Sequence, residues 1–177
     1  TTKGNYEAEL NRIFNKQLCL LYAQSFESFE RFLKDCLYKK MTNDSELSAF
    51  IDKQVNKNIP RPLSRAKMPG GDELFKILKK AGGHSFKEFS EGNNLHIPFK
   101  ELWTILSETR HSITHNDSEI SISFLKKSNN HWAIFEYLFE SKVVSEDTVL
   151  ITLDYKKFDR LNKRFAEFAY QLFKILS

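Results

Sequence analysis

The side chains best suited to chemistry lie together in one short stretch, from Arg110 to His115. His111 and His115 are four residues apart, so on a helix they share one face. An imidazole ionises near neutral pH and therefore transfers protons readily, while the planar guanidinium of Arg110 can bind two phosphate oxygens at once. These residue types at this spacing favour proton transfer beside a phosphate group.

This stretch is predicted to lie in a helix that begins at Pro98, because proline is favoured in the first helical turn. The buried face of that helix is defined by Phe99, Leu102, Trp103, Leu106 and Ile113. His111, His115 and Ser112 are predicted to lie opposite the buried face. The two imidazoles would then be ordinary surface histidines on a monomer, or would line a crevice where a second subunit covers them.

Arg110 falls inside the apolar face of the same helix, beside Trp103. A buried guanidinium is costly unless a carboxylate or phosphate meets it, because an unpaired buried charge loses its hydration. Glu30 lies at the border of the apolar stripe of the first helix and is therefore the predicted supporting carboxylate.

The motif Arg110-His111-Ser112-Ile113-Thr114-His115 resembles the signature of HEPN domains, the helical domains of toxin, abortive-infection and RNA-cleaving systems. That signature has an Arg, a polar residue, a short spacer with an aliphatic residue, and a His. The surroundings are similar too: a long N-terminal amphipathic helix rich in Phe and Glu, Asn116 directly after the His, and a closing amphipathic helix. The resemblance covers most of the chain and implies a compact all-α bundle.

The resemblance implies a metal-independent endoribonuclease that acts as a homodimer, with motifs from both subunits lining one cleft. His115 would take the proton from the ribose 2′-OH, and Arg110 would stabilise the negative charge on the phosphorane. His111 would position the substrate or assist the leaving group, and Asn116 would contact RNA. The alternative is an inactive HEPN module that serves dimerisation or the binding of nucleotides or RNA.

The same resemblance implies a biological setting. The expected partners are RNA, a second copy of the chain, and a cognate antitoxin or a regulatory domain. The expected role is in a toxin–antitoxin, abortive-infection or other defence system in the cytoplasm, with no cofactor.

A metal site is the main chemical rival, because His111 and His115 have the spacing of zinc-binding helices and Glu108 shares their face. The HExxH order is absent, so further ligands would have to come from His84, His96 or His131. We interpret those three histidines as incidental and expect no metal. A serine-hydrolase elbow and a glycine-rich phosphate loop are both missing from the sequence.

The chain is predicted to form one all-α domain over residues 1–177, because its 6 Gly and 4 Pro are too few for a turn-rich β fold. Apolar positions follow a helical period between Leu18 and Leu37, which predicts a long first helix. A final helix is expected after Asp154, which is placed to cap it.

Shorter elements are expected between these two helices. A helix over 45–56 should open with Asp44 or Ser45 as its N-cap. A second helix over 72–80 should be closed by Gly82-Gly83 and followed by a polar connector. The β-branched and aromatic runs Ile134–Phe139 and Thr148–Leu153 predict a small hairpin near 134–153.

The segment 58–71 holds three of the four prolines and is predicted to be a loop with one-sided charge. No acid lies between Asp52 and Asp72, while the basic residues there include Arg61, Arg65 and Lys67. Such a strip suits contact with RNA phosphates, and the net charge of +4 permits a polyanionic partner. The alternative is a solvated, mobile loop.

The longest unbroken apolar run, Leu18–Ala23, is far too short to span a bilayer, so no membrane partner is expected. No secretory signal is recognised either. Cys19 and Cys36 fall on one apolar helical face without CxxC spacing. They are predicted to be buried free thiols in a reducing cytosol.

Overall fold

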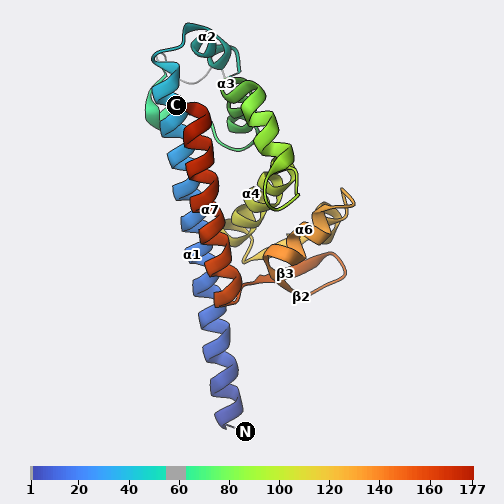
Figure 1. Ribbon diagram of the computed structural model, residues 1–177. Helices are drawn as coiled ribbons and strands as arrows, with labels where there is room; N and C mark the ends of the chain where they lie inside the picture. The colour runs from blue at the N-terminus through green and yellow to red at the C-terminus, as the bar shows by residue number, and fades with distance from the viewer. Residues whose placement is uncertain (1, 55–62) are drawn as a thin grey trace. The chain divides into compact units, whose positions relative to one another are not determined.

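The computed structural model describes residues 2–54 and 63–177 (Figure 1). Over these residues the chain is mainly α-helical, with long N- and C-terminal helices and a small three-stranded sheet, which confirms the predicted fold class. The chain divides into two compact units. Unit 1 comprises Thr1–Phe26 with Glu101–Phe165, and unit 2 comprises Glu27–Lys100 with Ala166–Ser177. That the chain is a single domain stays a prediction.

Unit 1 contains the N-terminal part of α1 (Thr2–Met41), most of α4 (Phe99–His115) and the first half of α7 (Tyr155–Leu176). The elements between α4 and α7 are β1 (Glu119–Ser121), α5 (Ile122–Leu125), α6 (His131–Leu138), β2 (Glu140–Val143) and β3 (Thr148–Thr152). None of the helices in the described part of the chain is long and apolar enough to cross a membrane.

Aromatic side chains from these elements form the core of unit 1. The Tyr22 and Phe139 rings meet edge to face with centroids 4.9 Å apart, and Phe26 lies 5.2 Å from Trp103. Phe165 of α7 completes the cluster at 6.0 Å from Phe26. The apolar face predicted for the first helix is therefore the face that packs, because these contacts bury its helically spaced residues.

The sheet of unit 1 is antiparallel, with β3 between β1 and β2. Val149 and Ile151 of β3 are buried, as the period of a half-buried strand requires. The predicted strand Thr148–Leu153 is thus confirmed.

The predicted strand Ile134–Phe139 is wrong, because that segment lies mostly in the helix α6. Ile134, Phe135 and Leu138 of α6 are all buried, a spacing that matches one face of a helix. Short apolar runs fit either structure, and the choice was made by packing. The hairpin exists, but its first strand is β2.

Unit 2 contains α2 (Ser45–Gln54), the short 3₁₀ helix η1 (Arg65–Lys67) and α3 (Gly71–Gly92). Asp44 caps α2, because its Oδ1 accepts a hydrogen bond of 2.9 Å from the Leu47 amide. Asp154 caps α7 in the same way, with the Lys157 amide 2.6 Å from its Oδ1. The cap Asp154 was predicted from the sequence, and Asp44 was one of the two caps, Asp44 or Ser45, predicted for α2.

Helix α3 breaks at Gly83, whose φ of 52° and ψ of −129° lie outside the helical region. The predicted stop at Gly82-Gly83 is therefore present, but the polar connector expected after it is wrong, since helix resumes and continues to Gly92. Phe86 and Phe89 in this second segment are buried. They join Phe75, Phe99 and Phe168 in the aromatic core of unit 2.

Candidate functional site

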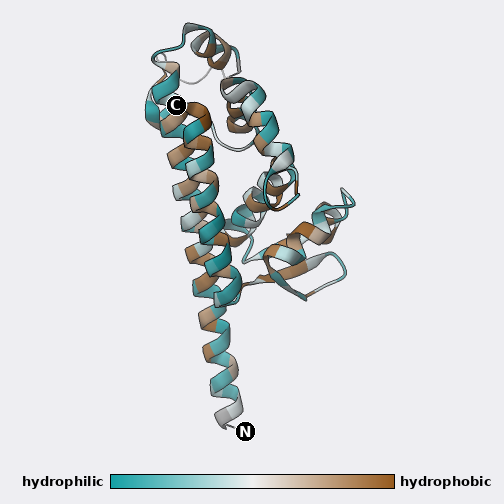
Figure 2. Cartoon of the chain, in the orientation of Figure 1, coloured by the Kyte–Doolittle hydropathy of each residue, from teal (hydrophilic) through white to brown (hydrophobic). Residues whose placement is uncertain are grey.

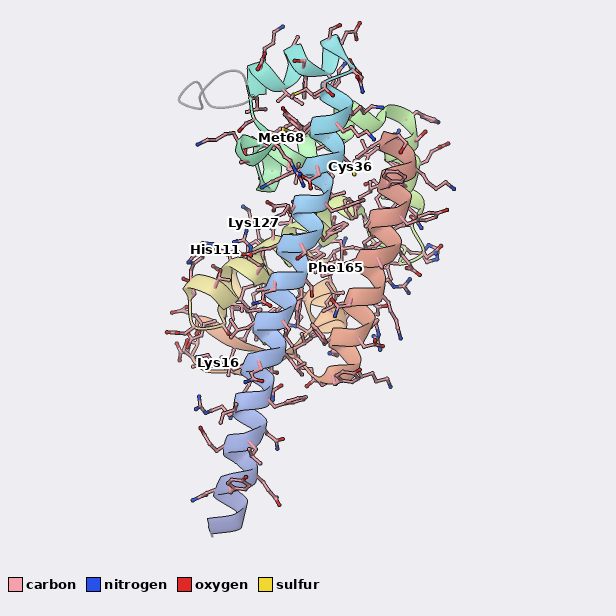
Figure 3. The ribbon with its side chains drawn as sticks, turned by 90° about the vertical axis from the view of Figure 1, so that its left-hand side faces the viewer. Lys16, Cys36, Met68, His111, Lys127 and Phe165 are labelled. Atoms are coloured by element: carbon pink, nitrogen blue, oxygen red, sulfur yellow. The ribbon has the colours of Figure 1, made fainter. Side chains whose placement is uncertain are left out.

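The last two turns of α4 carry the motif residues of unit 1. His111 and His115 are both exposed, and their ring centroids are 4.9 Å apart. Figure 3 shows His111 on this helix. The prediction that the two imidazoles share an outward face is confirmed, because their four-residue spacing brings them together on one side of the helix.

Arg110 is half-buried, whereas its place inside the apolar face predicted a buried side chain. Its guanidinium lies near the buried Tyr22 of α1. Burial raises the pKa of Tyr22 well above its usual range, and the positive charge of Arg110 lowers it in part. Tyr22 was not singled out from the sequence, although a tyrosine within the apolar stripe of the first helix is a signal for a buried hydroxyl with a partner.

Tyr22 also fixes the turn of α4 that leads to Arg110. Its hydroxyl donates a 2.7 Å hydrogen bond to the backbone carbonyl of Leu106, four residues before Arg110. The ring is held by Phe139 and Phe165. The helical turn that presents the guanidinium is thus attached to the aromatic core.

The chain folds back over the end of α4. The amides of Asn116 and Ser118 both donate to the carbonyl of Ser112, at 2.9 and 3.1 Å. Asp117 and Ser118 adopt positive φ values of 49° and 66°, which ends the helix and directs the chain into β1. His115 is therefore the last residue of α4, and Asn116 is exposed beside it.

Ser112 is buried, although its helical position predicted an outward side chain. The expectation is wrong because the turn after α4 returns across this residue, and the Ser118 carbonyl then accepts a 2.8 Å hydrogen bond from the amide of Ile151 in β3. A helical pattern describes the helix by itself and carries no information about this covering turn.

The other predicted site residues belong to unit 2. Glu30 is buried, and its Oε1 lies 2.6 Å from Lys34 Nζ on the next turn of α1. Its predicted pairing with Arg110 stays a prediction. Arg65 donates two hydrogen bonds to the Asp35 carboxylate, and Lys67 is exposed. Arg61 lies outside the described residues.

No group of three or more His, Cys, Asp or Glu side chains is placed to hold a metal ion in the part of the chain that the structure describes. His84 lies 3.2 Å from Glu88 in unit 2, and His131 is buried with its Nδ1 3.4 Å from the Phe124 carbonyl. His96 is exposed at a positive φ of 53°.

Both cysteines are free thiols, as predicted. Cys19 is buried, and this burial raises the pKa of its thiol to about 11. Cys36 is half-buried rather than buried, which corrects the expectation for that residue. Its side chain lines the open cavity of unit 2 described below.

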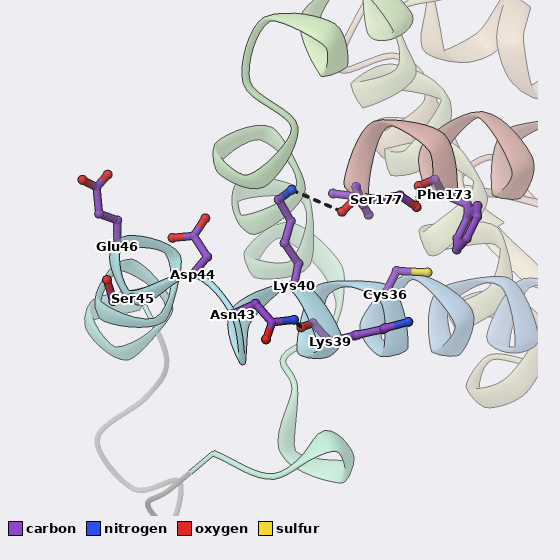
Figure 4. Close-up of a pocket in the computed structure, with 10 residues that line it drawn as sticks. Cys36, Lys39, Lys40, Asn43, Asp44, Ser45, Glu46, Phe173 and Ser177 are labelled. Carbon is purple, nitrogen blue, oxygen red and sulfur yellow. Dashed lines mark hydrogen bonds between the residues drawn. The ribbon is translucent and has the colours of Figure 1, made fainter.

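Unit 2 contains an open cavity of about 720 Å³ that sequence reasoning did not find (Figure 4). Its lining includes Cys36, Lys39 and Lys40 of α1 and Asp44 just before α2. Lys40 Nζ donates a 3.2 Å hydrogen bond to the Leu176 carbonyl at the end of α7. The adjacent lysines were the only sequence signal we recognise for this cavity. The Lys40 ammonium, however, binds the C-terminal end of α7, where a cation is favoured.

Comparison of the chain with protein-family models, with curated proteins and with solved structures finds no match.

Proposed function

We propose that the chain is a metal-independent endoribonuclease of HEPN type, with Arg110, His111 and His115 as its catalytic groups. The observation that carries the proposal is the end of α4, where the ring centroids of two exposed imidazoles lie 4.9 Å apart and the half-buried Arg110 directly precedes His111 in the chain. Proton-transfer groups and a permanent cation within one helical segment suit cleavage of a phosphodiester.

The chemistry requires a base, an acid and a charge stabiliser around one phosphate. His115 takes the proton from the ribose 2′-OH, and the 2′ oxygen then forms a bond to the adjacent phosphorus. Arg110 stabilises the added negative charge on the phosphorane oxygens. The bond to the 5′ oxygen breaks, and His111 assists that leaving group as it gains a proton. The products are a 2′,3′-cyclic phosphate and a 5′-hydroxyl.

A second copy of the chain completes this site in the proposal. In-line attack places the attacking and leaving oxygens on opposite sides of phosphorus, so one pair of imidazoles on a single helix face approaches from one side. Motifs of two subunits that face each other supply groups on both sides. The exposure of both histidines is compatible with a covering subunit.

The test is cleavage of labelled single-stranded RNA in the presence of EDTA. Cleavage that resists the chelator, gives cyclic-phosphate ends and spares DNA is expected. His115→Ala should lower the rate by about 10²–10⁴-fold, because that is the usual contribution of general acid–base catalysis. Since His115 is exposed, the free energy of unfolding of the His115→Ala variant should differ from that of the wild type by less than about 0.5 kcal/mol.

The matched control is His84→Ala, which removes an exposed histidine of unit 2. It should leave cleavage unchanged. Binding of RNA without cleavage, equal in the wild type and in an Arg110→Ala, His115→Ala double variant, would instead support the inactive binding module.

A further inference from the structure

The N-terminal half of α1 exposes a row of large apolar side chains that its own unit does not cover. The row, termed the α1 stripe, consists of Tyr6, Leu10, Ile13, Phe14, Leu20 and Leu21, each between 43% and 65% exposed. Figure 2 shows brown, apolar bands along this part of α1. At 3.6 residues per turn they fall within about one third of the helix circumference.

The α1 stripe lies on the side of the helix opposite the core. Leu18, Cys19, Tyr22 and Phe26 are the buried residues of this region, and their helical positions are turned by about half a circle from the stripe. Other exposed large apolar residues of the described chain, such as Tyr137 and Val143, lie elsewhere in the fold. A continuous exposed apolar face marks an interaction site.

The stripe repeats with the spacing of a helix-pairing seam. Tyr6, Ile13 and Leu20 are seven residues apart, and Leu10 and Gln17 fill the intervening positions. A seven-residue repeat keeps such a face against a second helix along its length. The stripe therefore fits a helix better than it fits a flat surface.

Charged residues beside the stripe indicate which partner helix it fits. Glu9 and Lys16 are exposed on the same flank of the stripe, seven residues apart, and Figure 3 shows Lys16 on α1. Two antiparallel copies of this helix bring like flanks together. When Leu10 of one copy packs opposite Ile13 of the other, Glu9 faces Lys16 of the second copy, and symmetry repeats the pair.

The same register also places the Gln17 amide opposite the Tyr6 hydroxyl of the other copy, so the polar position within the stripe gains a partner. A register shifted by one heptad would set Lys16 against Lys16. Parallel helices would set Glu9 beside Phe14. Of these three arrangements, only the antiparallel register with Leu10 opposite Ile13 brings Glu9 and Lys16 together. Glu9 also accepts hydrogen bonds of 2.6 and 2.9 Å from Arg12 of its own helix.

We propose that two copies of this chain associate through antiparallel pairing of their α1 stripes, with reciprocal Glu9–Lys16 contacts. The proposal does not depend on the nuclease activity. It supplies a means of joining two copies whether or not their α4 motifs act on RNA.

Charge reversal tests the pairing directly. Glu9→Lys and Lys16→Glu each place like charges opposite one another, so each variant should dimerise about tenfold more weakly than the wild type in sedimentation equilibrium. A mixture of the two variants should regain association, because both contacts of the mixed dimer then join a lysine of one variant to a glutamate of the other. Ile13→Asp should abolish pairing while circular dichroism shows unchanged helix.

The matched controls are Asp159→Lys and Lys163→Glu, which make the same charge changes on another helix, α7. They should leave the dissociation constant unchanged. A wild type that stays monomeric, a dimer insensitive to the charge reversals, or variants that weaken without recovery on mixing would each overturn the proposal. So would a monomer whose stripe becomes protected by lipid vesicles. Because the readout is mass, absence of RNA cleavage leaves this test intact.

Discussion

The two compact units differ in how their charged and titratable side chains are used. In unit 2, Glu30 lies against Lys34 and Arg65 against Asp35, so the residues that looked available in the sequence are engaged by neighbours. In unit 1, His111 and His115 are exposed next to each other at a helix end. Charged side chains in a sequence thus indicate a site only after their local partners are known, and unit 1 is where we place the chemistry.

The aromatic core of unit 2 offers the largest expected effect. Phe99 is fully buried, with its ring 5.0 Å from Phe89 and 5.4 Å from Phe168. Phe99→Ala should therefore lower the free energy of unfolding by about 3–5 kcal/mol. Both tryptophans of the chain, Trp103 and Trp132, lie in unit 1, so their fluorescence reports on that unit, whereas circular dichroism reports on both.

The same variant tests whether the chain unfolds as the single domain predicted from its sequence. For one cooperative domain, the fluorescence and circular dichroism transitions of Phe99→Ala shift together. A fluorescence transition that stays at the wild-type position, while circular dichroism shows early loss of helix, would contradict that prediction. The two units would then also differ in their free energy of unfolding.

The reactivities of the two thiols should differ by an amount intermediate among the effects predicted here. Burial raises the pKa of Cys19 from 9.0 to about 11, which lowers its thiolate fraction near pH 8 by about 100-fold. Cys36 of unit 2 is half-buried, and burial and Asp35 raise its pKa. Alkylation by iodoacetamide, followed by mass spectrometry, should modify Cys36 well before Cys19.

The pH dependence has a defined sign. The unfolded chain releases the Cys19 proton at a lower pH than the folded chain does, so this thiol should reduce stability as pH rises from about 9 towards 11. Replacement by Ser should remove that part of the decline. Equal labelling of both thiols in the folded protein would contradict the burial of Cys19.

The basic residues of unit 2 should show the smallest effect. If the segment around η1 contacts RNA, Lys67→Ala should weaken binding by roughly threefold to tenfold and reduce the salt dependence by about one counterion. Arg65→Ala should change affinity less, because Asp35 already balances its charge. Filter binding across a salt series measures the affinity and the salt dependence of both variants. Equal losses of affinity would show that the Arg65–Asp35 contact breaks when RNA binds.

Much of the fold follows from local pattern. The apolar face of α1, the caps Asp44 and Asp154, and the strand β3 were predicted, because each depends on residues close together in the chain. The outward imidazoles were predicted for the same reason. The helix α6 and the continuation of α3 beyond Gly83 were missed, since short segments take the structure that their distant contacts favour.

The sequence by itself determined the helical faces, and with them the position of His111 and His115 on one side of α4, because helical spacing is a property of the chain. Tertiary structure decided which polar groups on those faces remain exposed to solvent. The hydrogen bond from the Ile151 amide to the Ser118 carbonyl and the one from the Tyr22 hydroxyl to the Leu106 carbonyl join residues far apart in sequence, and no local pattern specifies such contacts. Burial depends on what packs against a residue, which the residue's own helix does not encode.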